Sequence, residues 1–447
     1  MNRRKFIAET SAALAGAAFA PLIPAWAQEP PDVKLEIAPL ALEIAPRKIV
    51  HTVAYNGRVP GPLIRWPEGK PIVIDVLNKT AIPEIVHAHG LWIPSEMDGA
   101  SEEGAPTIAP GAQFRYMFTP RPAGFRWYHT HISAGHDLKR ATYSGEFGCF
   151  YVEPKQEPGA YDQEIFLTLH DWNAYVSASG ESSMEAAYEY GTIDGRMLGF
   201  GDPIRVREGQ RVLFHLLNAS ASMMHWLALA GHELTIVSMD GNPVPNPGDM
   251  HAVRLGPAER IDAIVTMNHP GVWILGETRE PLRKAGMGIV VEYADQQGAP
   301  KWIGPPETIW DYRPFAVAQA ESREPDEIIP LRFESKFHGQ GAFDSWKING
   351  KSYPDTDTIM LRQGRRYRLQ MINRTADDHP LHLHRHNFEV TKFNGTPLSR
   401  LMKDVLVVPA NATAEVDFTA DNPGPTLFHC HNQTHMDFGF MMLFRYA

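Results

Sequence analysis

The sequence predicts an all-β protein built from three tandem copies of one sandwich-like domain. The main observation is a repeated strand pattern: segments 69–78, 209–218 and 364–373 each run from glycine to asparagine, with apolar residues at every second position. Such alternation is typical of half-buried strands. The 36 glycines and 37 prolines among 447 residues supply the frequent turns that short strands require.

A second repeated block follows in each copy. Segments 124–131, 271–278 and 424–431 each run from glycine through an apolar strand. The first block ends in His-Thr-His and the third in His-Cys-His, whereas the middle block ends in Gly-Glu-Thr. The spacing of the blocks is that of separate domains and not of a solenoid. The middle copy is therefore expected to lack metal-ligating residues.

The repeats give approximate domain boundaries. We expect domains at 28–157, 158–300 and 301–447, and the proline-containing stretch 296–326 is expected to link the second domain to the third. Helical content should be low, and residues 184–190 are the best candidate for a short helix.

The chain concentrates metal-ligating residues in four clusters. Residues 429–435 read His-Cys-His-Asn-Gln-Thr-His, residues 379–384 read His-Pro-Leu-His-Leu-His, and His-x-His occurs at 87–89 and 129–131. Side chains alternate between the two faces of a strand, so parity divides these residues into two sets. The first set, typical of a blue-copper electron-transfer site, is His379, Cys430 and His435. The second, suited to three borderline metal ions, is His87, His89, His129, His131, His382, His384, His429 and His431.

These four motifs, in this order, resemble those of the multicopper oxidases from about residue 35 to the C-terminus. The resemblance implies three tandem cupredoxin-like Greek-key β-barrel domains and four copper ions. It implies a type 1 copper on His379, Cys430 and His435, and a type 2 copper on His87 and His382. The type 3 pair would be held by His89, His129, His131, His384, His429 and His431.

The resemblance also implies the reaction. A reducing substrate would lose single electrons at the type 1 copper, and O₂ would be reduced to water at the trinuclear copper cluster. Because only the first and third domains supply the eight histidines, we expect this cluster at an interface between domains. The middle domain would be a spacer and a possible wall of the substrate site.

The axial position of the type 1 copper, ten residues after the cysteine in the family, is Phe440 here. Loss of a weak axial donor favours Cu(I) and raises the potential. Core packing alone would also explain Phe440, and a one-residue bulge would bring Met441 to the copper instead.

Other residues near the clusters allow two interpretations. Asp98 stands where the family has a proton-relay aspartate, but it is also a turn residue before a glycine. The second acidic relay of some bacterial members is replaced by Met436, which Asp437 follows. Arg385, where relatives usually have glycine, could shape the rim of the type 1 site or pair with a carboxylate.

The reductant is less well defined by the sequence. The third domain has no methionine-rich run to cover the type 1 site. Together with Phe440, this favours laccase-like oxidation of phenols and aromatic amines. The alternatives are a metallo-oxidase for Cu(I), Fe(II) or Mn(II) and, in another class, a non-catalytic periplasmic binding protein of cupredoxin fold.

The N-terminus and composition indicate the compartment. Residues 2–7 read Asn-Arg-Arg-Lys-Phe-Ile, and Ala-Trp-Ala at 25–27 fits a cleavage site, so residues 1–27 resemble a twin-arginine signal peptide. We expect export by the twin-arginine machinery to the periplasm, as a monomer without a membrane anchor after cleavage. The net charge of −10 argues against a nucleic-acid partner. Cys149, in an apolar run, is expected to be a core residue.

Overall fold

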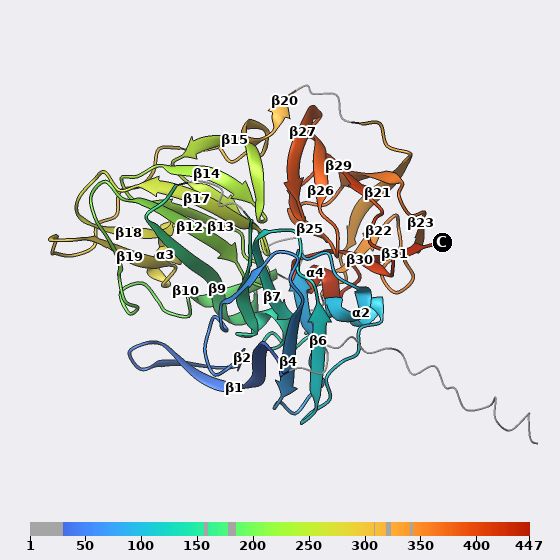
Figure 1. Ribbon diagram of the computed structural model, residues 1–447, viewed down its shortest axis with the longest axis horizontal. Helices are drawn as coiled ribbons and strands as arrows, with labels where there is room; N and C mark the ends of the chain where they lie inside the picture. Colours follow the sequence, from blue (N-terminus) through green and yellow to red (C-terminus); the bar gives the residue numbers. More distant parts are fainter. Residues whose placement is uncertain (1–29, 156–159, 178–184, 308, 319–322, 340–342) are drawn as a thin grey trace, which may run out of the picture.

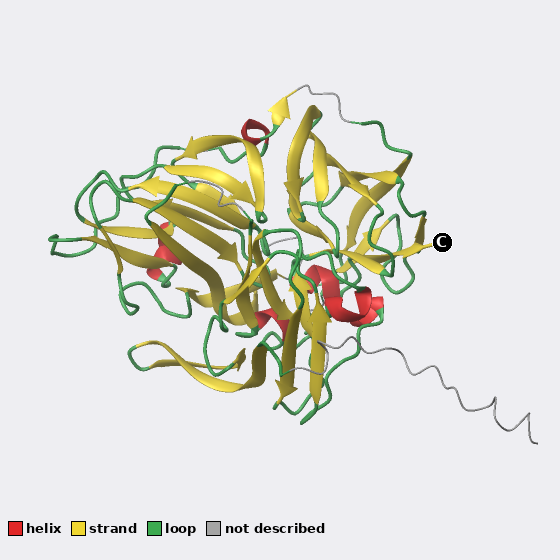
Figure 2. Cartoon of the chain, viewed as in Figure 1, coloured by secondary structure: helices red, strands yellow, loops and turns green. Residues whose placement is uncertain are grey.

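The computed structural model describes residues 30–155, 160–177, 185–307, 309–318, 323–339 and 343–447. The predicted signal peptide at 1–27 lies outside these residues, and export remains a prediction. Strands dominate the described chain and form six sheets (Figures 1 and 2). The sheets pair into three β-sandwiches, as the strand repeat predicted.

The first sandwich packs a sheet of order β2-β1-β4-β6 against one of order β3-β8-β7-β5. Its core includes Leu35 and Ile74 from the first sheet and Phe150 from the second. The strands are β1 (Val33–Ala45), β2 (Lys48–Tyr55), β3 (Ile64–Pro67), β4 (Ile72–Asn78), β5 (Val86–His89), β6 (Gln113–Phe118), β7 (Gly124–Thr130) and β8 (Phe147–Glu153).

The middle sandwich has sheets of order β10-β9-β12-β17-β14-β15 and β11-β19-β18-β13-β16. Its strands are β9 (Gln163–Ser177), β10 (Glu185–Ile193), β11 (Ile204–Val206), β12 (Arg211–Asn218), β13 (His225–Leu229), β14 (Leu234–Met239), β15 (Asn242–Met250), β16 (Val253–Leu255), β17 (Arg260–Thr266), β18 (Val272–Glu277) and β19 (Gly288–Tyr293).

The third sandwich has sheets of order β20-β27-β26-β29-β24-β21-β22 and β23-β31-β30-β25-β28. Its strands are β20 (Val317–Ala318), β21 (Glu327–Lys336), β22 (Ser345–Ile348), β23 (Ile359–Leu361), β24 (Arg366–Asn373), β25 (His379–Leu383), β26 (Phe388–Phe393), β27 (Thr396–Lys403), β28 (Val405–Val408), β29 (Thr413–Thr419), β30 (Thr426–Cys430) and β31 (Met441–Tyr446).

Helices are few and short, as expected. The described residues contain α2 (Ser95–Asp98), α3 (Glu280–Lys284), α4 (Gln433–Asp437) and the 3₁₀ turns η2 (Ser101–Glu103), η3 (Ala141–Tyr143) and η4 (Arg313–Phe315). No helix in this part of the chain is long and apolar enough to cross a membrane.

The helix expected at 184–190 is wrong. Residue 184 is outside the described residues, and the rest belongs to strand β10, which pairs antiparallel with β9 along nearly its whole length. Glutamate and alanine favour helix, but intrinsic propensity is a small energy that this tertiary pairing overrides. Cys149 is buried in the core on β8, as predicted, and both cysteines are free.

The repeated glycine and asparagine have the same structural roles in all three sandwiches. Gly69, Gly209 and Gly364 have φ angles of 77°, 80° and 82°, a left-handed conformation that suits glycine in a turn. The asparagines that end β4, β12 and β24 are fully buried, and each side chain donates to backbone carbonyls of neighbouring loops. The sequence repeat is therefore a repeat of one turn and one buried hydrogen-bonding device.

Candidate metal centre

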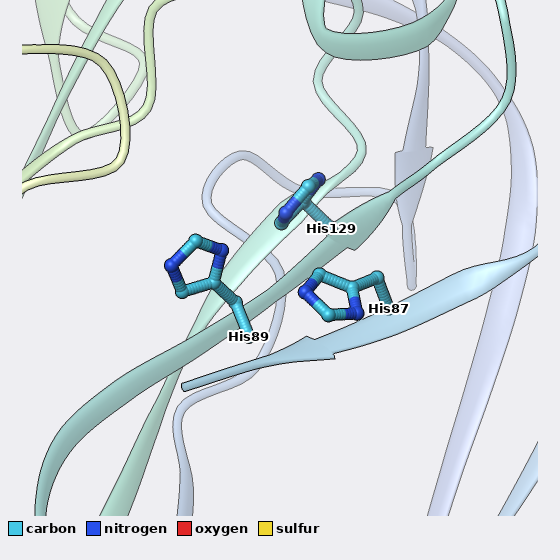
Figure 3. A group of neighbouring side chains, drawn as sticks. All are labelled: His87, His89 and His129. Atoms are coloured by element: carbon cyan, nitrogen blue, oxygen red, sulfur yellow. The ribbon is translucent and has the colours of Figure 1, made fainter. Parts of the chain in front are cut away.

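The eight predicted histidines converge between the first and third sandwiches. His87 and His89 extend from β5 beside His129 of β7 (Figure 3), and His87 lies opposite His129 in the strand register. In the third sandwich, His382 of β25 lies opposite His429 of β30. Ring centroids of His89 and His382 are 3.8 Å apart, which brings the two halves into contact. None of the eight side chains is more than 5% exposed.

Most of these rings are held by an outer hydrogen-bond partner. Nδ1 of His87, His129, His382 and His429 each lies 2.7–2.9 Å from a backbone carbonyl oxygen. Nδ1 of His384 lies 2.7 Å from Asp98 Oδ2, and Nε2 of His89 lies 3.2 Å from Asp404 Oδ1. Such partners fix the tautomer and the orientation of a metal-ligating imidazole.

The other ring nitrogens fit a metal cluster. Six of them are buried with no hydrogen-bond partner among the described residues: Nε2 of His87, His129, His382 and His431, and Nδ1 of His89 and His131. His384 Nε2 lies 3.0 Å from His429 Nε2, so these rings also face one another. Buried nitrogens normally have partners, and bound metal ions would satisfy all of these at once.

Electrostatics favours the same state. Burial, followed for most of these rings by repulsion from neighbouring imidazoles, lowers the pKa of seven of the eight: His89, His129, His131, His382, His384, His429 and His431. The rings are therefore neutral near pH 7, and metal ions bind the neutral imidazole.

The second predicted set also comes together. His379 Nδ1 lies 3.1 Å from His435 Nδ1, and Cys430 Sγ lies 3.7 and 3.5 Å from these two nitrogens. The far nitrogens are held by Thr375 Oγ1, at 2.7 Å from His379 Nε2, and by the Asn432 amide, at 3.1 Å from His435 Nε2. This His₂Cys group suits copper.

Strand β30 connects the two groups. His429 and Cys430 are consecutive, and their side chains reach opposite faces because β30 is extended. His431 follows directly and faces the histidine cluster. A single peptide segment thus joins the thiolate to two imidazoles of the other group through covalent bonds.

The structure favours Phe440 over Met441 at the axial position. Phe440 is fully buried, and its ring centroid lies 4.8 Å from that of His379. Met441 lies opposite His429 in the register and packs with Leu427 and Met436 in a separate apolar cluster.

The histidines of the His₂Cys group are more enclosed than the sequence suggested. The ring of Trp346, on β22, lies 3.8 Å from that of His435, and His435 is 2% exposed. Trp346 is itself 1% exposed, so His435 is enclosed by core packing and not by a methionine-rich segment. Nearby, Phe343 and Phe438 stack at 4.7 Å, with the exposed His136 ring against both.

Acidic residues near the cluster include one that the sequence interpretation missed. Asp98 accepts from His384 and also lies 3.1 Å from His87 Nδ1. Burial raises the pKa of this carboxyl, but His87 and His384 lower it by more, so that it lies well below its usual range. Glu103 was not predicted; its Oε1 accepts from Leu427 N at 2.7 Å and lies 3.2 Å from His384 Nδ1.

Arg385 and Asp437, whose roles the sequence left open, both have hydrogen-bond partners in the structure. Arg385 is buried and donates to backbone carbonyls of Ile93, Asn422, Pro423 and Pro425, so it fastens loops of the first and third domains. It forms no ion pair with a carboxylate in the described part of the chain. Asp437 accepts from Ser133, Ala134, Gly135 and Gln433, which ties α4 to a loop of the first domain.

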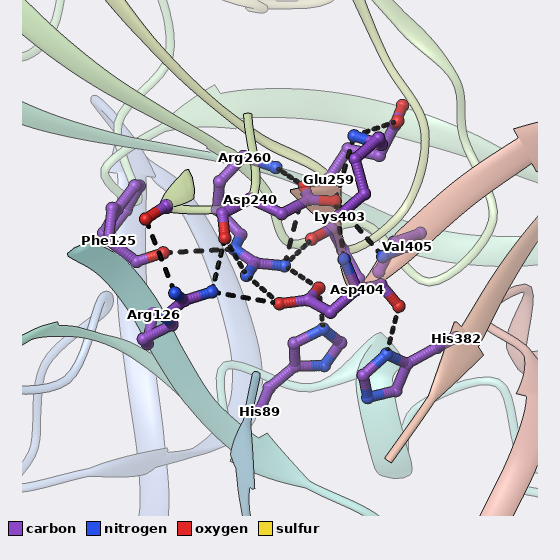
Figure 4. A network of polar contacts seen from close by, with 12 residues as sticks. His89, Phe125, Arg126, Asp240, Glu259, Arg260, His382, Lys403, Asp404 and Val405 are labelled. Atoms are coloured by element: carbon purple, nitrogen blue, oxygen red, sulfur yellow. Dashed lines mark hydrogen bonds and ion pairs between the residues drawn. The ribbon is translucent and has the colours of Figure 1, made fainter. Parts of the chain in front are cut away.

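All three domains meet at a buried charge network next to the histidines (Figure 4). Both carboxylate oxygens of Asp404 accept from Arg260 at 2.6 Å, and Arg126 lies 3.3 Å from the same carboxylate. Lys403 pairs with Asp240 and Glu259 of the middle domain. Since Asp404 also contacts His89 and its carbonyl accepts from His382, this network positions ligands from both sides.

The middle domain keeps the outline of the His₂Cys group without its thiolate. Glu277 lies opposite Leu227 in the strand register, just as Cys430 lies opposite Leu381. His225 lies two residues before Leu227, and His379 lies two residues before Leu381. His225 Nδ1 lies 3.0 Å from Glu277 and Nε2 lies 2.8 Å from Asp171. Burial lowers the pKa of His225, but the two carboxylates raise it to about 9, so an imidazolium ion pair replaces the metal group.

Comparison with known proteins identifies the family. Multicopper oxidase family models match residues 41–157, 163–291 and 329–447. The chain therefore belongs to the multicopper oxidases, which are oxidoreductases that use O₂ and a reducing substrate, and the family implies copper as the metal.

Three proteins illustrate the likeness. Multicopper oxidase MmcO of Mycobacterium tuberculosis is 30% identical, over 87% of this chain and 81% of its own. Laccase-2 of Fomitopsis schrenkii is 26% identical, over 88% of this chain and 85% of its own. A crystal structure of Fet3p, described as a multicopper oxidase that functions in iron import, superposes with a TM-score of 0.79 at 19% identity, over 93% of this chain and 90% of its own.

The axial assignment gives a direct prediction. Phe440→Met would offer a thioether to a copper ion held by the His₂Cys group and should lower its reduction potential, because a weak axial donor stabilises Cu(II) more than Cu(I). A fall of about 59 mV would correspond to a tenfold change in the equilibrium constant of a one-electron couple. Redox titration of the blue absorption measures it. Met441→Leu is the matched control, and a potential that shifts only in this control would make Met441 the axial residue.

Proposed function

We propose that this protein is a laccase-like oxidase that couples one-electron oxidation of a phenolic or aromatic amine substrate to reduction of O₂ to water. The observation that carries the proposal is the pair of complete ligand groups joined by His429, Cys430 and His431. His379, Cys430 and His435 would hold one type 1 copper. The eight histidines would hold a type 2 copper, on His87 and His382, and a type 3 pair, on the other six.

Bound copper would supply the storage of four electrons that reduction of O₂ to two water molecules requires. The protein's own contribution is to position and enclose the metals. Burial keeps the imidazoles neutral, and the outer partners on Asp98, Asp404 and the backbone hold the rings in place. The buried, covalently continuous segment at Cys430 offers the shortest connection between the two groups.

The surroundings of the type 1 group support an aromatic reductant. Trp346, itself only 1% exposed, packs on His435, so a substrate would approach the less buried rings of Phe343 and Phe438 nearby. Aromatic molecules pack favourably against such rings in offset or edge geometry. Oxidation of a metal ion is the second candidate, favoured by the likeness to Fet3p.

Copper loading tests the two-centre assignment. Wild-type protein should bind about four copper ions and be intensely blue, and Cys430→Ser should abolish the colour while retaining about three, because the eight imidazoles do not include the thiolate. Metal analysis and visible absorption measure this. Cys149→Ser, the matched control, should stay blue. A colourless, fully loaded wild type would refute the assignment.

Oxygen uptake tests the reductant. Uptake should be fastest with a dimethoxyphenol, compared with Cu(I) and Fe(II), and Phe438→Ala should raise KM for the phenol several-fold with little change in kcat, because an aromatic contact is lost. Faster uptake with either metal ion would establish the metallo-oxidase function instead. Blue, copper-loaded protein that takes up no O₂ with any reductant would favour the non-catalytic binding function.

Asp98 has two roles under this proposal: it orients His384 and, as in the family, carries protons to the oxygen site. Asp98→Asn keeps the shape but removes the titratable group. It should slow turnover at least several-fold and leave the blue absorption unchanged, because Asp98 does not contact the His₂Cys group. Stopped-flow reoxidation by O₂ measures the effect, and wild-type rates across the pH range would reduce Asp98 to a turn residue.

A further inference from the structure

Two buried glutamates lie beside the first-domain histidines and are not used by the chemistry above. Glu84 precedes β5 and is 1% exposed, and Glu146 precedes β8 and is 3% exposed. Their carboxyl groups hydrogen-bond each other. Since a carboxylate can only accept, one member of the pair must carry the proton that they share.

The remaining contacts of the pair come from hydroxyl groups. Thr130 Oγ1 donates to Glu84 Oε2 at 3.4 Å, and Ser144 Oγ donates to Glu146 Oε2 at 3.1 Å. The Oε1 atoms of both glutamates and the Tyr55 hydroxyl are buried without a donor or acceptor among the described residues. Several polar atoms of this kind in one place suit ordered water, which binds two to four such partners.

Two ionisable groups face the pair, and neither neutralises it. Arg140, which is partly exposed, lowers the pKa of both carboxyls. The fully buried Tyr55 faces the two carboxyls from β2. Burial dominates: it raises the pKa of Glu84 to about 7. Burial and the charge of Glu84 raise the pKa of Glu146 further above its ordinary value. Two carboxyls in contact share a proton in this way.

The position of the pair connects it to the oxygen site. Thr130 is the last residue of β7 and lies between His129 and His131, so its side chain points to the other face of the strand, toward Glu84, while its backbone N–H donates to Glu146 O at 3.1 Å. Thr130 also lines a small cavity together with His129, His131, His429 and His431. Met436 lines the same cavity, in the place where some relatives have an acidic relay.

We infer that Glu84 and Glu146 form a proton store that supplies the trinuclear site from the first-domain side, by way of the Thr130 hydroxyl and water. The inference rests on the proposed O₂ reduction, which consumes four protons and four electrons for each O₂. On release, the pair loses its shared proton, and one proton from solvent at the Arg140 edge restores it. No electron moves and no covalent bond other than O–H changes.

The shared proton can be tested without turnover. Infrared difference spectra of copper-loaded protein, titrated through the neutral range, should show a protonated-carboxyl band that shifts in Glu146→Gln and in Glu84→Gln and is lost in the double variant. Glutamine preserves shape and hydrogen bonding, and the two single variants guard against a folding defect in one of them. Glu153→Gln, on the exposed end of β8, is the control and should keep the band. A band that is unchanged in both single variants, or that survives in the double variant, would overturn the inference.

Delivery to the oxygen site is tested by the pH profile. With saturating reductant, Glu146→Gln should turn over at nearly the wild-type rate in acid, where solvent supplies protons, and several-fold more slowly above about pH 7. A profile that superposes on wild type would refute the delivery role even if the band shifts. Wild-type protein that takes up no O₂ would instead refute the proposed function, and the delivery role with it.

Discussion

The arrangement of the three domains depends on the buried contacts of the Asp404 carboxylate. This carboxylate accepts from Arg260 of the middle domain, lies beside Arg126 of the first, and orients His89, all without exposure to solvent. Removing one partner from such a buried network typically costs about 3–5 kcal/mol, because a charge is left uncompensated. The middle domain, which supplies no histidine to the cluster, is therefore needed to hold the domains that do.

The sequence predicted most of the fold and which histidines come together in each group, because both follow from local patterns. Strand parity assigns each histidine to a face within a few residues, and the repeated glycine and asparagine mark equivalent turns. Asp404 and Glu103 escaped notice because their partners are remote: His89 is 315 residues from Asp404, and Leu427 is 324 residues from Glu103. The sequence offered one sign of the charge network: Lys403 and Asp404 are adjacent charged residues within an otherwise apolar segment.

The features that the sequence analysis predicted wrongly or left open also depend on partners that are remote in the sequence. Residues 185–190, part of the expected helix, become a strand because β9 offers them a nearly complete row of backbone partners. The cover over His435 could not be predicted because Trp346 is 89 positions away in the chain, and nothing in its neighbourhood marks it. Arg385 adopts a left-handed backbone, with φ of 59°, and reaches carbonyl groups of loops that only the folded chain assembles.

The ion pair at His225 has a consequence for assembly. Asp171 and Glu277 satisfy both nitrogens of that ring, so the middle domain is complete as soon as its chain has folded. The outer domains instead bury six ring nitrogens of the histidine cluster that have no partner among the described residues and that bound metal would satisfy. Without copper, the unsatisfied ring nitrogens of the cluster destabilise the first and third domains. The middle domain needs no metal at His225, so it can stay folded and provide the surface on which the other two assemble when copper binds.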